Sequence, residues 1–193
     1  MKPSLFLLLL LFPLLVEAQD FSFTAFSEQS LQYNRTGMLI LGTWALGNIG
    51  LAATQLPKSQ GDVFYFHQMN LAWNVANLGL AGIGFLQASQ GAEHTLAEVL
   101  GSQHFNEKVF LVNAALDLAY ISTGFYLQEK GKNAIKHSDR LKGYGKAVIL
   151  QGSFLLLFDG IMYGLHHVHG AELNRWLENA QIGLNHVSYS FYF

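Results

Sequence analysis

The sequence contains no cysteine, and this absence removes several chemistries at once. Without a thiol, the chain forms no disulfide and holds neither a thiolate-bound metal nor an iron–sulfur cluster. A cysteine nucleophile is excluded for the same reason.

Charge is also scarce, because Asp, Glu, Lys and Arg make up only 12% of the 193 residues while hydrophobic residues make up 51%. An average soluble domain carries about 25% charged residues. This chain therefore has too little charge to cover a soluble surface, and we expect it to contact the lipid bilayer. The formal net charge of −2 is close to neutral, so we expect no nucleic acid partner.

Residues 1–18 are predicted to be a signal peptide. Lys2 supplies the charged start, an apolar core follows, and Val16-Glu17-Ala18 has the small-residue pattern of a cleavage site. The apolar core is shorter than the roughly 20 residues that a membrane span needs. Whether the signal is cleaved or remains as an anchor stays open. Residues 19–37 are expected to form an extracytoplasmic N-terminal segment.

Four apolar runs follow, and none of them contains Lys, Arg or Glu. The runs are residues 38–56, 64–86, 109–127 and 148–165. Their lengths are those of membrane helices, and they mostly lack the polar face that a soluble helix shows. We predict an all-α protein, a transmembrane four-helix up-down-up-down bundle within residues 38–168. Gly160 and Gly164, with Gly79, Gly82 and Gly84, are expected to let these helices pack closely.

The connectors predict the orientation of this bundle. Residues 57–63 form a short turn, so the first two runs make an antiparallel hairpin. Residues 128–146 hold six of the chain's eleven Lys and Arg residues, and the positive-inside rule places this loop in the cytoplasm. Both mature termini, including the tail 169–193, then lie outside, as a cleaved signal requires.

Three shorter segments are expected to lie at the membrane surface. Residues 95–100 and 171–179 are predicted to be short helices. Residues 187–193 alternate with a period of two and resemble the last strand of an outer-membrane barrel. Because one strand cannot make a barrel, we expect an aromatic tail that lies on the membrane or pairs with a partner.

Each apolar run carries a polar residue near its middle: Asn48, Asn77, Asp117 and Asp159. An antiparallel bundle would gather these four into one polar intramembrane layer. Six more polar residues extend the same helical faces at steps of three or four: Asn70, Asn74, Asn113, His67, Tyr163 and His166. The stripe is expected to face inward, because a carboxylate facing lipid costs at least about 2.5–3.5 kcal/mol.

This layer predicts a site that binds or moves a small polar solute, a cation or a proton. Asp117 and Asp159 would carry the charge or the proton. The asparagines would coordinate the solute, and His67 and His166 would flank the two mouths. Because four helices are few for a transporter, we expect a homo-oligomer.

Other functions stay open. The protein would instead be an accessory subunit that docks on a membrane partner protein if the polar layer only fixes helix packing. The run His166-His167-Val168-His169 would bind a metal at the outer surface, with His94 or His104. The paired aspartates would suit an intramembrane hydrolase, but neither G-x-S-x-G nor H-E-x-x-H accompanies them, so an enzyme is the weaker interpretation. The sequence leaves any cofactor unknown.

The stretches that carry a family resemblance are Trp44-Ala45-Leu46-Gly47-Asn48 in the first run and Asn70-Leu71-Ala72-Trp73-Asn74 in the second. With these residues, the chain resembles a family of small exported four-helix bacterial membrane proteins of unknown function. The resemblance covers about residues 30–170. It implies the bacterial cytoplasmic (inner) membrane as the location, and it implies no activity and no catalytic residue.

Overall fold

The computed structural model describes residues 21–182 and 187–189. This part of the chain is helical, as predicted, apart from one short pair of strands. The elements are α1 (Phe23–Gln55), a 3-10 turn (Leu56–Lys58), α2 (Gly61–Ala88), α3 (Leu96–Lys132), α4 (Ser138–Asn179), β1 (Ala180–Ile182) and β2 (Val187–Tyr189). The predicted signal peptide 1–18 lies outside the described residues.

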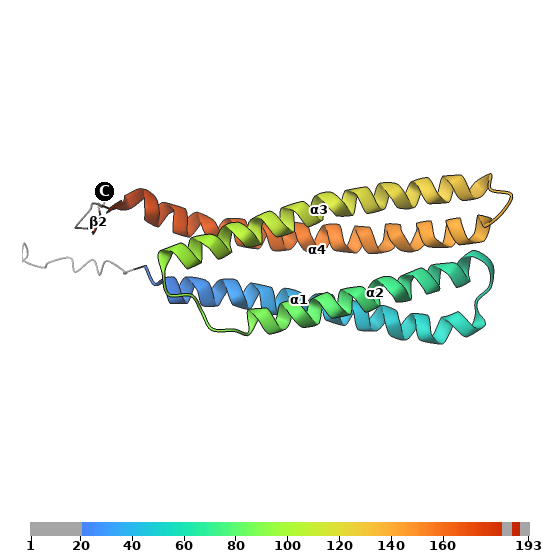
Figure 1. Ribbon diagram of the computed structural model, residues 1–193, viewed down its shortest axis with the longest axis horizontal. Coiled ribbons are helices and arrows are strands. Elements are labelled where there is room, and N and C mark those ends of the chain that lie inside the picture. The colour runs from blue at the N-terminus through green and yellow to red at the C-terminus, as the bar shows by residue number, and fades with distance from the viewer. Residues whose placement is uncertain (1–20, 183–186, 190–193) are drawn as a thin grey trace, which may run out of the picture.

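The helices form two antiparallel hairpins, α1 with α2 and α3 with α4, that lie side by side (Figure 1). Helix α4 packs along α3 and also against α2, so it joins the two hairpins. The connections 56–60 and 133–137 meet at one end of the bundle, which we call the turn end. The start of α1, the connection 89–95 and the end of α4 meet at the other end, the terminal end.

Local sequence explains where the helices begin. The Ser22 side chain accepts a hydrogen bond from the Ala25 amide at 3.2 Å and caps α1. At α3, Thr95 and Glu98 form a capping box, in which each side chain bonds the other's backbone amide. Gly61 opens α2 with a φ of +59°, a left-handed conformation that glycine adopts without steric cost.

The helices are longer than the apolar runs predict. Helix α1 already begins at Phe23, within the predicted N-terminal segment. The predicted helix 95–100 is the first part of α3, and the predicted helix 171–179 is the last part of α4. At 1.5 Å per residue, the 42 residues of α4 span about 63 Å, roughly twice the hydrocarbon thickness of a bilayer. An apolar cluster of Phe26, Val99 and Leu173 holds the helices together at the terminal end.

The alternating C-terminal segment pairs within the tail itself. Strand β2 lies antiparallel to β1, with Ser188 opposite Gln181. Residues 187–189 thus find their strand partner within the chain, and the expectation that the tail lies on the membrane or pairs with a partner protein stays a prediction. Residues 190–193 of the predicted aromatic tail lie outside the described part of the chain.

Within the described residues, three helices are long and apolar enough to cross a membrane, one fewer than predicted. They are α1 with its 3-10 turn (Phe23–Lys58), α3 and α4. Helix α2 has the length, but its buried seam consists of His67, Asn70, Asn74 and Asn77. These side chains lower its overall apolarity, although its outward positions, such as Leu80 and Ile83, are apolar.

The interior holds many polar side chains beside its apolar core, which is unusual for a soluble bundle. Among the completely buried side chains are Asn70, Asn74 and Gln151, each 0% exposed. Large apolar side chains cover the outside of all four helices instead. Examples are Leu39, Leu46, Leu80, Ile83, Leu111, Leu118, Leu157 and Ile161. A surface of this kind suits contact with lipid.

Glycines set the closest helix contacts, but they are not the glycines that the sequence pattern predicts. A Cβ added at Gly145 would lie 2.6 Å from the Gly124 carbonyl oxygen of α3. A Cβ at Gly143 would overlap the Asp62 carbonyl oxygen of α2. By contrast, Gly160 and Gly164 have nothing within 4 Å of an added Cβ, and the same holds for Gly79 and Gly82. Of the predicted set, Gly84 alone makes a close contact, with the Met38 side chain of α1.

One ion pair joins α2 and α4 at the turn end, and it predicts a loss of stability in acid. Lys146 Nζ donates to the Asp62 carboxylate at 2.6 Å, and this bond holds the pKa of Asp62 below its ordinary value. A carboxyl whose folded-state pKa is depressed stabilises the fold above its unfolded pKa and loses that contribution as pH falls. We expect the melting temperature of the wild type to fall more between about pH 5 and pH 3 than that of Asp62→Asn.

Because Asp62 and Lys146 side chains are 30% and 50% exposed, this effect is small, of the order of 0.2–1 kcal/mol. Glu129→Gln is the control, since Glu129 pairs with Lys132 within α3 and joins no two helices. Equal acid sensitivity of the wild type and Asp62→Asn would contradict a role for the pair in holding α2 to α4.

Candidate functional site

An amide cluster of Asn48, Asn70, Asn74 and Gln151, with Trp44, lies between α1, α2 and α4. Trp44 Nε1 donates to Gln151 Oε1 at 3.0 Å, and Gln151 Nε2 donates to Asn70 Oδ1 at 2.5 Å. Asn70 Nδ2 in turn donates to Asn48 Oδ1 at 3.0 Å. These bonds form a continuous chain across three helices, which fixes their relative register.

Asn74 completes the cluster from the same face of α2. Its Nδ2 donates to the Asn70 carbonyl oxygen at 2.7 Å and lies 3.3 Å from Asn70 Oδ1. Asn74 Oδ1 is buried and has no hydrogen-bond partner among the described residues. The cluster therefore retains one unused acceptor.

A carboxyl pair, Asp117 of α3 and Asp159 of α4, lies between these two helices. The side chains are 2% and 4% exposed, and the two carboxyl groups are within hydrogen-bonding reach of each other. Asn113 Nδ2 approaches Asp159 Oδ1 at 3.5 Å. Asp117 Oδ2 is buried without a hydrogen-bond partner in the described part of the chain.

Asn77 lies near the level of the carboxyl pair, not in the amide cluster. Helices α2 and α4 run in the same direction, and Asn70 contacts Gln151. Two helical turns further along, Asn77 therefore comes level with Asp159. Its Nδ2 is buried without a partner among the described residues. It is an unused donor at about the depth of the carboxyl pair.

The predicted site residues therefore lie at two main depths and not in one layer. The step of seven residues from Asn70 to Asn77 separates the amide cluster from the carboxyl pair by about 10 Å. The prediction aligned the four helices at the middle of their apolar runs. In the structure, packing shifts the helices along their axes relative to one another. Asn48 consequently contacts Asn70 and not Asn77.

The remaining predicted residues lie nearer the two ends. His67 is 8% exposed, close to the turn end, and its Nδ1 is buried with no partner in the described structure. Tyr163 stacks on His167 at 5.5 Å, one turn further along α4. His166 is completely buried, and its Nε2 lies 2.9 Å from Asn34 Oδ1.

His166 belongs to a polar network at the terminal end that the sequence interpretation missed. Asn106 of α3 hydrogen-bonds both Ser30 and Asn34 of α1, and these two side chains contact the two ring nitrogens of His166. Gln103 of α3 donates to the His166 carbonyl oxygen at 2.6 Å. A signal for Gln103 was present, because it lies two heptads before Asp117 on the buried face of α3.

Gln151 was also missed, although it is the central residue of the amide cluster. It lies near the start of the fourth apolar run, far from the middle that the sequence interpretation used. Its spacing from Asp159, eight residues, places it close to the same face of α4 two turns away. A complete list of polar residues on that face would have included it.

The described residues contain no group of three or more His, Asp or Glu side chains placed to hold a metal ion. In the His166–His169 run, His166 bonds Asn34, while His169 Nε2 bonds the Phe26 carbonyl oxygen at 3.0 Å. His94 lies against Thr24 instead. The structure therefore does not support the metal site that this run suggested.

Comparison with known proteins identifies a family but no activity. The sequence matches DUF6992, a family of unknown function, over residues 40–160, which is more than half of the chain. The chain belongs to DUF6992. The matched region contains the amide cluster and the carboxyl pair, and it leaves out Ser30, Asn34 and His166. No curated protein and no solved structure matches this DUF6992 protein.

Proposed function

We propose that this DUF6992 protein is a bacterial inner-membrane protein that binds a proton or a small cation between Asp117 and Asp159. The observation that carries the proposal is the carboxyl pair itself, on facing helices and almost completely buried. Even one ionised carboxylate in the hydrocarbon region costs at least about 2.5–3.5 kcal/mol. A bound proton or monovalent cation would remove part of that cost.

The surroundings of the pair support a bound positive charge. Within the described residues, no Lys or Arg forms an ion pair with either carboxyl group. Asp117 Oδ2 and Asn77 Nδ2 have no hydrogen-bond partner there. The Asn77 side chain has an amide oxygen as well, and a flip of the amide group would place that oxygen where the nitrogen now lies, as a ligand for a cation. Oxygen ligands of this kind suit hard cations.

We also propose that all four helices cross the membrane, α2 included. Its polar side chains face α1 and α4, so the polar seam is shielded from lipid, and its exposed face is apolar. The turn end would lie in the cytoplasm, because the 128–146 connection is rich in Lys and Arg. The terminal end, with the His166 network, would lie outside.

Thermal unfolding of the purified protein in detergent tests this function. Melting temperatures are measured across pH and in Na⁺, K⁺ and Li⁺ for the wild type and for Asp117→Asn, Asp159→Asn. A ligand that binds only the folded state raises the melting temperature by mass action. We expect a pH- or cation-dependent shift in the wild type that the double variant has lost.

Asp139→Asn is the matched control, because Asp139 is an exposed carboxyl in the first turn of α4. It should keep the wild-type response. Flat curves in the wild type, or equal responses in the wild type and the double variant, would overturn the proposed site.

A second function, that of an accessory subunit, is favoured by the amide cluster. Its hydrogen bonds already join three helices without any ligand. Interhelical bonds of this kind fix register in membrane bundles. We therefore propose a structural role for Asn48, Asn70 and Gln151. If the pH and cation test fails, this role would extend to the carboxyl pair.

A further inference from the structure

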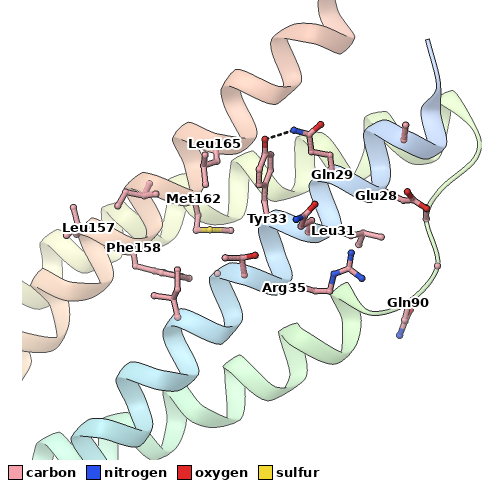
Figure 2. A pocket seen from close by; sticks show the side chains of 18 of the residues that line it. Glu28, Gln29, Leu31, Tyr33, Arg35, Gln90, Leu157, Phe158, Met162 and Leu165 are labelled. Atoms are coloured by element: carbon pink, nitrogen blue, oxygen red, sulfur yellow. Dashed lines mark hydrogen bonds between the residues drawn. The ribbon is translucent and has the colours of Figure 1, made fainter. Parts of the chain in front are cut away.

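A cavity of about 1160 Å³ lies beside α1 at the terminal end, bounded by α4 and the connection 89–95. Figure 2 shows its two chemically different ends. Leu157, Phe158 and Met162 of α4 lie at one end, and Glu28, Arg35 and Gln90 lie toward the other. An occupant that fits both ends must be amphiphilic.

The polarity of the cavity changes in the same direction as that of a bilayer. Its apolar lining, such as Ile40, Leu157 and Ile161, comes from the apolar runs 38–56 and 148–165. Its polar lining, such as Gln32 and Arg35, comes from the part of α1 that precedes the first run. The apolar end therefore lies at hydrocarbon depth, and the polar end lies at the level of the outer head groups.

Arg35 gives the polar end a specific chemistry. It is the only Lys or Arg in the lining, and no described residue forms a hydrogen bond or an ion pair with its guanidinium group. Arginine binds phosphate through paired N–H donors, and this geometry favours phosphate over a neutral head group. The guanidinium is therefore free to take an anionic partner from outside the chain.

We propose that this cavity binds one phospholipid of the outer leaflet, with its phosphate on Arg35 and an acyl chain along Phe158, Ile161 and Leu165. The volume exceeds the roughly 300–1,000 Å³ of ordinary small-ligand pockets, as a chain together with a head group requires. The inference rests on the proposed membrane insertion but not on the carboxyl pair, from which it is separate.

Native mass spectrometry of the full-length protein in detergent, supplemented with phosphatidylglycerol, tests the proposal. We expect the wild type to retain one lipid molecule, and Arg35→Gln to lower its occupancy at least about tenfold. Lys58→Gln is the matched control, because it removes an exposed cation at the turn end. It should leave the occupancy unchanged.

Ile161→Trp tests the apolar end by filling it, and it should also reduce lipid retention. The Asp117→Asn, Asp159→Asn variant should retain lipid like the wild type, so failure of the cation site and failure of the lipid site are distinguishable. Equal retention in the wild type, Arg35→Gln and Ile161→Trp would overturn the proposal, because the lipid would then be bound only around the general surface. A rise in melting temperature with inorganic phosphate would also overturn it, if that rise equals the one with lipid and is lost in Arg35→Gln.

Discussion

Replacing Gly143 with alanine should destabilise the bundle strongly, whereas the same change at Gly160 should not. At Gly143 the new Cβ would overlap the Asp62 carbonyl oxygen and lie 2.7 Å from the Phe66 amide nitrogen. These are backbone atoms of α2, so they cannot rotate away, and the helices would have to separate. Overpacking of this kind typically costs about 1–3 kcal/mol.

The control is unusually direct because both glycines lie in the same helix. At Gly160 an added Cβ meets nothing within 4 Å, so alanine should stabilise α4 slightly through its higher helix propensity, by about 0.5–1 kcal/mol. Thermal unfolding in detergent would measure both changes, which should have opposite signs. Equal destabilisation by the two variants would mean that Gly160 also packs closely, for example against a second copy of the chain.

Replacing Gln151 with leucine should have the second large effect, because it breaks the amide cluster at its centre. The Trp44 indole would lose its acceptor, and Asn70 Oδ1 would lose its shortest bond. A buried polar group left without a partner costs about 1–3 kcal/mol. Interhelical hydrogen bonds in membrane proteins average less, about 0.6 kcal/mol, because the released groups find other partners. We expect a loss of about 1–2 kcal/mol.

Ser122→Ala is the control for this variant. Its hydroxyl donates to the Leu118 carbonyl oxygen of its own helix and joins no second helix. Removing it should change the free energy of unfolding by less than half as much. Tryptophan fluorescence would add a local measurement, since Trp44 stacks on Phe154 at 4.0 Å and its environment should change in Gln151→Leu. A Gln151→Leu protein as stable as the wild type would contradict the structural role of the cluster.

Hydropathy predicted the helical class and the cores of the helices, because the apolar runs are long and free of Lys, Arg and Glu. It could not predict where α1 or α4 would begin or end. The parts beyond the runs are held by contacts such as the packing of Phe26 on Leu173, which do not depend on lipid. Tertiary packing, and not the length of the apolar runs, therefore determines where these helices begin and end.

The sequence predicts which residues belong to the candidate site better than it predicts which of them contact one another. Asp117 and Asp159 stand out in any reading of apolar runs, and the structure brings them together. The pairing of Asn48 with Asn70 could not be predicted, because it depends on the vertical offset between helices and the sequence carries no measure of that offset. Gly160 and Gly164 are a second example. Their spacing of four residues places both on one face of α4, but it does not show whether another helix packs against that face.

If all four helices cross the membrane, as we propose, the polar seam of α2 has a consequence for biogenesis. A segment that carries His67, Asn70, Asn74 and Asn77 is a poor substrate for insertion by itself, since insertion machinery responds to overall apolarity. During insertion, the short connection 56–60 would hold α2 beside α1, and Asn48 would then accept the hydrogen bond of Asn70 before that side chain is exposed to lipid. The first two helices would thus enter the bilayer as one unit. Lengthening that connection should lower the yield of inserted protein more than it lowers the stability of molecules that have already folded.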